Sequence, residues 1–196
     1  MPARSATPGS TTDPSDRCPI AATHAAEPTV PDGVVTTSIP FGLRITHPAD
    51  WPVTDVTVPA SEVLDQRTLP LVGLTTDAAL GPLAMRAASA YPGIAIFRFQ
   101  RPQGIDLVTL TDMMREFQSS RHFVVTDQTL TGCIDGEAAA GVSGTTTRVL
   151  EVVWLTLHAD SFYVVACLAK DDGIPTTQRE MNAVFQRTLD TLRWLP

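Results

Sequence analysis

Two apolar runs between Val149 and Ala169 (VLEVVWLTLHADSFYVVACLA) are separated only by the pair Ala159–Asp160. This pattern predicts a β-hairpin. One face of its first strand carries Val149, Val153, Leu155 and Leu157, and the other face carries Leu150, Val152 and Trp154. Since both faces are apolar, we expect the hairpin to be buried and the rest of the chain to pack against it.

Alternating patterns predict further strands. Phe41, Leu43 and Ile45 share one face of a half-buried strand, because side chains alternate between the two faces with a period of two. A turn from Pro48 to Pro52 follows, and Trp51 within it is expected to anchor the sheet edge. Other predicted strands cover residues 53–58, 69–76, 94–100 and 123–130.

Two helices are predicted from stripes of apolar residues at spacings of three and four. The first covers about residues 106–120, with Asp106 as its N-cap. The second runs to Leu192, and Thr177 and Glu180 match a capping box at its start. Trp194 is expected to seal this last helix to the sheet.

The segment from Gly136 to Gly141 is rich in Gly and Ala. Such small residues predict a strand that lies beneath a helix or an aromatic cluster. The order of the elements, with more strands than helices and with hairpin connections, predicts an α+β fold: an antiparallel β-sheet with helices packed on one face.

The first 34 residues are rich in Pro, Thr, Ser and Ala and hold almost no large apolar side chain. They cannot bury enough surface to offset the entropy of ordering, so we expect a disordered tail at 1–34 and a single domain at 35–196. The tail has no apolar segment of the signal-peptide type, and no run of about 18 apolar residues occurs in the chain. A cytoplasmic location without membrane insertion is therefore the expectation.

The formal net charge is −7, and Lys170 is the single lysine. This charge argues against nucleic acid as a partner, because nucleic acids are bound through Lys/Arg patches. The three cysteines, Cys18, Cys133 and Cys167, form no CxxC pair and are odd in number. Neither a disulfide framework nor a zinc site is predicted, and no cofactor or metal is expected.

Motifs for catalysis are weak. The chain has no P-loop, no GxGxxG and no GxSxG elbow. His158 and Asp160 place a base and a carboxylate together at the hairpin tip, which would be half of an acid–base site. Hairpin tips are usually solvated and no third group is evident, so a non-enzymatic protein is the prediction. A hydrolase whose site combines His158, Asp160 and a neighbouring Cys or Ser is the weaker alternative.

Several of these features resemble the PsbP/DcrB-like superfamily, which includes the LpqN/LpqT-type actinobacterial lipoproteins. They are the apolar strand followed by Pro48-x-x-Trp51, the Gly136–Ala140 element, Phe162–Tyr163 after the hairpin turn, and the terminal helix with its aromatic tail. The resemblance covers about residues 36–196.

The resemblance implies a fold that serves mostly non-enzymatic proteins, including assembly factors, envelope lipoproteins and chaperones. We therefore expect an adaptor or chaperone that holds an apolar segment of a protein partner, or a second copy of the chain, on its sheet face. The candidate contact residues are Val149, Glu151, Val153, Leu155, Leu157 and Trp154. A cell-envelope, lipoprotein-like protein with an unrecognised leader remains the alternative.

Overall fold

The structure is a computed structural model that describes residues 18, 29–55, 58–59, 79–80, 83–86, 91–101, 104–120, 124–146 and 148–196. The predicted strand at 69–76, and the predicted tail apart from Cys18 and residues 29–34, lie outside the described residues. The elements are β1 (Gly33–Ser38), β2 (Leu43–Pro48), β3 (Val53–Asp55), β4 (Val58–Pro59), β5 (Ala79–Leu80), β6 (Leu83–Arg86), β7 (Gly93–Gln100), α3 (Leu107–Ser120), β8 (Val124–Ile134), β9 (Glu137–Thr146), β10 (Val149–His158), β11 (Ser161–Lys170), α4 (Pro175–Asp190) and β12 (Arg193–Trp194).

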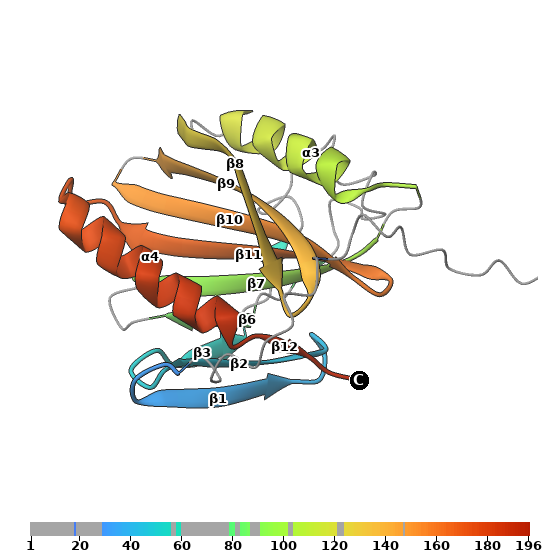
Figure 1. The fold of residues 1–196 in the computed structure, drawn as a ribbon, viewed down its shortest axis with the longest axis horizontal. Coiled ribbons are helices and arrows are strands. Elements are labelled where there is room, and N and C mark those ends of the chain that lie inside the picture. Colours follow the sequence, from blue (N-terminus) through green and yellow to red (C-terminus); the bar gives the residue numbers. More distant parts are fainter. Residues whose placement is uncertain are drawn as a thin grey trace, which may run out of the picture.

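The predicted hairpin lies near the middle of a seven-stranded antiparallel sheet with the order β3-β6-β7-β11-β10-β9-β8 (Figure 1). Strands β10 and β11 pair from Val149↔Lys170 to His158↔Ser161, and Ala159–Asp160 forms the turn as predicted. Ala159 has a φ of 49°, the left-handed geometry of a tight hairpin turn. The hairpin therefore has paired neighbours on both sides, and neither of its strands lies at an edge of the sheet.

A smaller sheet with the order β1-β2-β12 brings the two ends of the domain together. Arg193 and Trp194 of β12 pair with Arg44 and Leu43 of β2. The alternation predicted for β2 is confirmed, because Leu43 and Ile45 are fully buried. The first described strand begins at Gly33, within the segment predicted to be a tail.

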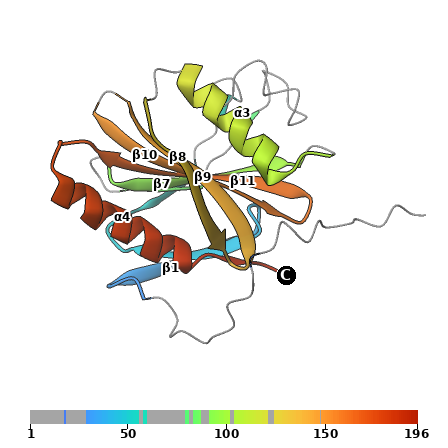
Figure 2. The same cartoon turned by 45° about the horizontal axis from the view of Figure 1, so that its top comes forward.

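The α+β class is confirmed, but the two helices cover opposite faces of the large sheet rather than one shared face (Figures 1 and 2). Helix α3 contributes Leu110 and Met114 to a cluster with Val153, Leu155 and Leu157. Helix α4 contributes Phe185 and Leu189 to the cluster on the other face. The apolar stripes identified both helices, but the face that each helix covers depends on the direction in which the chain leaves the preceding strand.

The α4 side holds the larger cluster, because the small sheet also packs there. Leu43 and Ile45 of β2 meet Ile94 and Ile96 of β7 in this cluster. Trp51 is buried and lies 6.3 Å from Phe185, centroid to centroid, so it anchors the sheet edge against α4 as predicted. Both faces of β10 and β11 are consequently covered.

The helix starts differ in how well the sequence predicted them. Asp106 is the N-cap of α3, since its Oδ1 accepts a hydrogen bond from the Thr109 N–H at 2.8 Å. The capping box predicted at Thr177 is wrong: Ile174 is the N-cap, no side chain caps it, and a proline occupies the first turn. Pro175 fits this position because the first turn does not need its missing N–H.

A groove between α4 and strands β8 to β10

The indole of Trp154 forms the floor of a groove on the α4 face of the sheet. A Cβ placed on Gly141 of β9 would lie 3.0 Å from Trp154 Cε3 and 2.9 Å from the Val153 carbonyl oxygen. A Cβ on Gly132 of β8 would lie 3.3 Å from Trp154 Cζ3. The ring therefore lies close over Gly141 and Gly132 of two neighbouring strands. The prediction that the Gly/Ala-rich strand passes beneath a large group is confirmed at Gly141, whereas a Cβ on Gly136 would meet nothing within 4 Å.

Two adjoining cavities make up this groove, which we call the α4 groove. The larger, about 300 Å³, is lined by Leu130, Ser143, Val152, Trp154, Cys167, Asn182, Phe185, Gln186 and Leu189. The smaller, about 180 Å³, is lined by Thr131, Gly132, Cys133, Ile134, Trp154, Gln186 and Leu189. Since both contain Trp154, Gln186 and Leu189, they form one depression that runs along α4 to the end of β8.

Among the residues whose side chains the structure describes, those that line the α4 groove carry no charge. Burial is the main reason that the pKa of the Cys167 thiol is raised, and the charge of Glu151 raises it further. The thiol is therefore neutral and a poor nucleophile, because the thiolate is the reactive form. The groove offers apolar surface with a few neutral polar groups and no acid–base chemistry.

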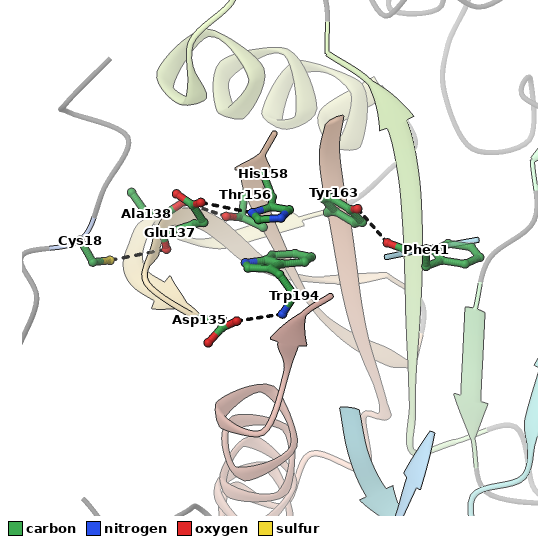
Figure 3. A network of polar contacts seen from close by, with 9 residues as sticks. All are labelled: Cys18, Phe41, Asp135, Glu137, Ala138, Thr156, His158, Tyr163 and Trp194. Atoms are coloured by element: carbon green, nitrogen blue, oxygen red, sulfur yellow. Dashed lines mark hydrogen bonds and ion pairs between the residues drawn. The ribbon is translucent and has the colours of Figure 1, made fainter. Parts of the chain in front are cut away.

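Cys18 and Cys133 form a disulfide across 115 residues of sequence, which corrects the expectation that no disulfide exists. The backbone N–H of Cys18 donates to the Gly136 carbonyl at 3.2 Å. Its sulfur lies 3.5 Å from the Glu137 oxygen (Figure 3). The same sulfur lies 3.6 Å from the Gly132 oxygen. The N-terminal segment is thus attached to the β8–β9 hairpin, far from it in sequence.

The other side of the same hairpin holds the C-terminus (Figure 3). Asp135 Oδ2 accepts a hydrogen bond from the Trp194 N–H at 2.8 Å. The His158 ring stacks on Trp194 with 4.5 Å between centroids, and its Nδ1 lies 3.2 Å from Glu137 Oε1. Trp194 also packs at 4.7 Å against Tyr163, whose hydroxyl donates to the Phe41 carbonyl. Trp194 therefore fixes the chain end to the tip of the sheet, beyond α4.

The six predicted contact residues do not form one surface. Val153, Leu155 and Leu157 are only 2%, 2% and 3% exposed, in the cluster that α3 covers. Val149 and Glu151 are half-buried on the same strand. Trp154 alone faces the α4 groove. The sequence did not indicate Asn182, Gln186 or Gly132 as groove residues, because only the fold brings α4 beside β8.

The candidate hydrolase residues make other contacts or face solvent, although His158 and Ser161 are cross-strand partners at the end of the hairpin. His158 pairs with Glu137, whereas Asp160 is exposed on the turn. Ser161 is buried and accepts a hydrogen bond from Arg98 Nε at 3.0 Å. Neither cavity of the α4 groove includes these side chains.

Two absences hold for the residues that the structure describes. No group of three or more His, Cys, Asp or Glu side chains is arranged to hold a metal ion in that part of the chain. Within the same residues, no helix is long and apolar enough to cross a membrane.

The fold and groove define an α+β protein with a PsbP-like fold. The chain is similar to the solution structure of cyanobacterial PsbP (CyanoP) from Synechocystis sp. PCC 6803, with a TM-score of 0.54 and 10% sequence identity. The match covers 90% of this chain and 99% of that one. No protein-family model matches the chain, and no curated protein does so either. At this identity the likeness establishes the fold alone.

Proposed function

We propose that this chain is a non-enzymatic binding module that holds an uncharged, apolar segment of a protein partner in the α4 groove. The observation that supports this most directly is the groove itself, which joins an apolar floor at Trp154 to a lining without charge. An adaptor or chaperone of the PsbP/DcrB-like type, with the LpqN/LpqT-type proteins as relatives, fits this description.

The size of the groove limits what it can hold. A volume of about 300 Å³ is at the lower end of the range of ligand sites, so the groove fits a few side chains and not a folded domain. Asn182 and Gln186, one turn apart on α4, place amide groups along its rim. Amides both donate and accept hydrogen bonds, which suits the backbone of an extended segment.

Selection from a displayed library of random nonapeptides tests this proposal. We expect the full chain to enrich peptides with several apolar residues and no charge at their centre. Asn182→Arg places a charged side chain at the exposed rim of the groove. It should weaken binding of the enriched peptides at least tenfold, because a bound apolar segment would have to cover this charge without giving it a partner. Ala183→Arg adds the same charge at an exposed position outside the groove and should leave binding unchanged.

Failure to enrich any peptide, or equal losses in Asn182→Arg and Ala183→Arg, would overturn the proposal. Analytical ultracentrifugation without peptide covers the case in which the partner is a second copy. A dimer that Asn182→Arg dissociates and Ala183→Arg does not would identify the groove as a self-association site.

The disulfide supports the cell-envelope alternative for location over the cytoplasm. Disulfides persist in oxidising compartments and are rare in the cytosol. Protein taken from acid-quenched cells and alkylated before reduction distinguishes the two. Alkylated Cys18 and Cys133 would indicate a reducing compartment, and unmodified ones an oxidising compartment.

A further inference from the structure

The Cys18–Cys133 bond is positioned to do more than hold the N-terminal segment. We infer that it is an exchangeable disulfide through which a dithiol controls the β8–β9 end of the α4 groove. This inference rests on the proposed function of the groove.

The bond is accessible from solvent on the Cys133 side. Cys133 is exposed, whereas Cys18 is half-buried, and the remaining cysteine, Cys167, is fully buried. Thiol–disulfide exchange requires a thiolate to reach one sulfur in line with the bond. Attack is therefore expected at Cys133 Sγ.

The exchange has two steps. A thiolate of the dithiol bonds to Cys133 Sγ, the Cys18–Cys133 bond breaks, and Cys18 leaves as a thiolate that takes up a proton. The second thiolate of the dithiol then attacks the first sulfur of the dithiol, which is bonded to Cys133 Sγ in the mixed disulfide. The bond to Cys133 breaks, and Cys133 leaves as a thiolate. One protein disulfide becomes two thiols, and the dithiol becomes a disulfide.

The surroundings of Cys18 favour the reverse reaction. Its N–H is hydrogen-bonded to the Gly136 carbonyl, and the Gly132 and Glu137 carbonyl oxygens lie beside its sulfur. A Cys18 thiol can donate to either oxygen and so remain near Cys133. Re-formation with an oxidised dithiol as electron acceptor is then intramolecular in its second step, which makes the bond reversible.

The link to the groove runs through the backbone of β8. Gly132 faces Trp154, so the alternation of the strand directs the Cys133 side chain to the other face of the sheet. Cys133 is itself among the residues that line the end of the groove, so the disulfide fixes the strand that forms this end from Thr131 to Ile134. The adjoining turn holds Asp135, which binds the backbone of Trp194.

Amide hydrogen exchange on the full chain, with and without dithiothreitol, tests the inference. Reduction should speed exchange in residues 130–137 at least fivefold. Reduction should also lower the affinity of the chain for the peptides enriched from the nonapeptide library at least threefold. The Cys18→Ser variant should show the fast exchange and the weaker affinity in both conditions. Alkylation of the native chain should modify two cysteines after reduction and none before, with Cys167 protected until the protein unfolds.

The outcomes separate the two proposals. Unchanged exchange in residues 130–137, or resistance of the bond to dithiothreitol in the folded protein, overturns this inference whatever the peptides do. Faster exchange with unchanged peptide affinity also overturns it, because the bond then does not control the groove. If no peptide binds in either state, the proposed function fails, and with it the link from the bond to the groove.

Discussion

Tyr163 places a hydroxyl group inside an otherwise apolar cluster between the two sheets. It is almost completely buried, and its O–H donates to the Phe41 carbonyl at 2.8 Å, 122 residues away in sequence. This bond holds the segment just before β2 against β11, because a carbonyl that has left water needs a donor. A single side chain thus connects the small sheet to the large one.

Tyr163→Phe should lower the free energy of unfolding by about 1–3 kcal/mol, because it leaves a buried carbonyl without its donor. Urea denaturation measures this change. Thr37→Val, which removes an exposed hydroxyl of β1, is the control and should have little effect. An equal loss in both variants would show that the bond to Phe41 contributes nothing of its own.

The pH dependence of stability gives a second readout of the same variant. Burial raises the pKa of Tyr163 above 10.0, against a smaller opposing effect of the Arg98 charge. The neutral form is favoured in the folded state, so this stability is complete below pH 10 and is lost as the pH rises through the folded pKa. The difference in stability between the wild type and Tyr163→Phe should therefore narrow as the pH rises above 10 and through the folded pKa of Tyr163.

At the scale of elements, the starts of α3 and α4 show how closely a capping residue in the sequence predicts where a helix begins. Asp106 accepts the Thr109 N–H, and this hydrogen bond is the main reason that the pKa of Asp106 is lowered. Thr177 matches the same kind of signal but lies inside α4, because Pro175 already begins the helix. Ser, Thr and Asp close to a proline therefore identify a helix start only to within a turn.

Asp106→Ala should lower the melting temperature by a few degrees, since α3 loses its side-chain cap. Thr177→Ala should change it far less, because Thr177 caps nothing. Differential scanning calorimetry at pH 7 compares the two variants. Below the folded pKa of Asp106 the wild type should lose this advantage, because the protonated carboxyl is a weaker acceptor.

At the scale of the whole molecule, local patterns predicted the elements but not their long-range partners. The alternation in β2 and the apolar runs of β10 and β11 follow from burial and could be predicted from the sequence, as could both helical stripes. The pairing of Cys18 with Cys133 could not be predicted, because 115 residues separate them and Cys18 lies in a segment with almost no large apolar side chains. The α4 groove was missed for a related reason: its lining comes from β8, β9, β10, β11 and α4.

The end of the chain should contribute to the stability of the whole domain. Trp194→Ala removes the ring that packs on His158 and Tyr163 and should cost about 2–3 kcal/mol, somewhat less than the loss of a fully buried aromatic residue. Guanidinium denaturation measures the cost, and deletion of the exposed Pro196 serves as the control. Similar stability of Trp194→Ala and the wild type would contradict this prediction and would mean that the packing of Trp194 does not stabilise the domain.

The attachment of Cys18 also has a mechanical consequence. A force applied to the N-terminal segment passes through the disulfide into the β8–β9 hairpin and bypasses everything between the two cysteines. While the bond is intact, the chain between Cys18 and Cys133, a separation of 115 residues, cannot be extended by the force. At up to ~3.6 Å per residue, the disulfide prevents the extension of roughly 400 Å of chain. The small sheet, the β6–β7 edge and α3 are thereby shielded from a pull that would otherwise reach them first.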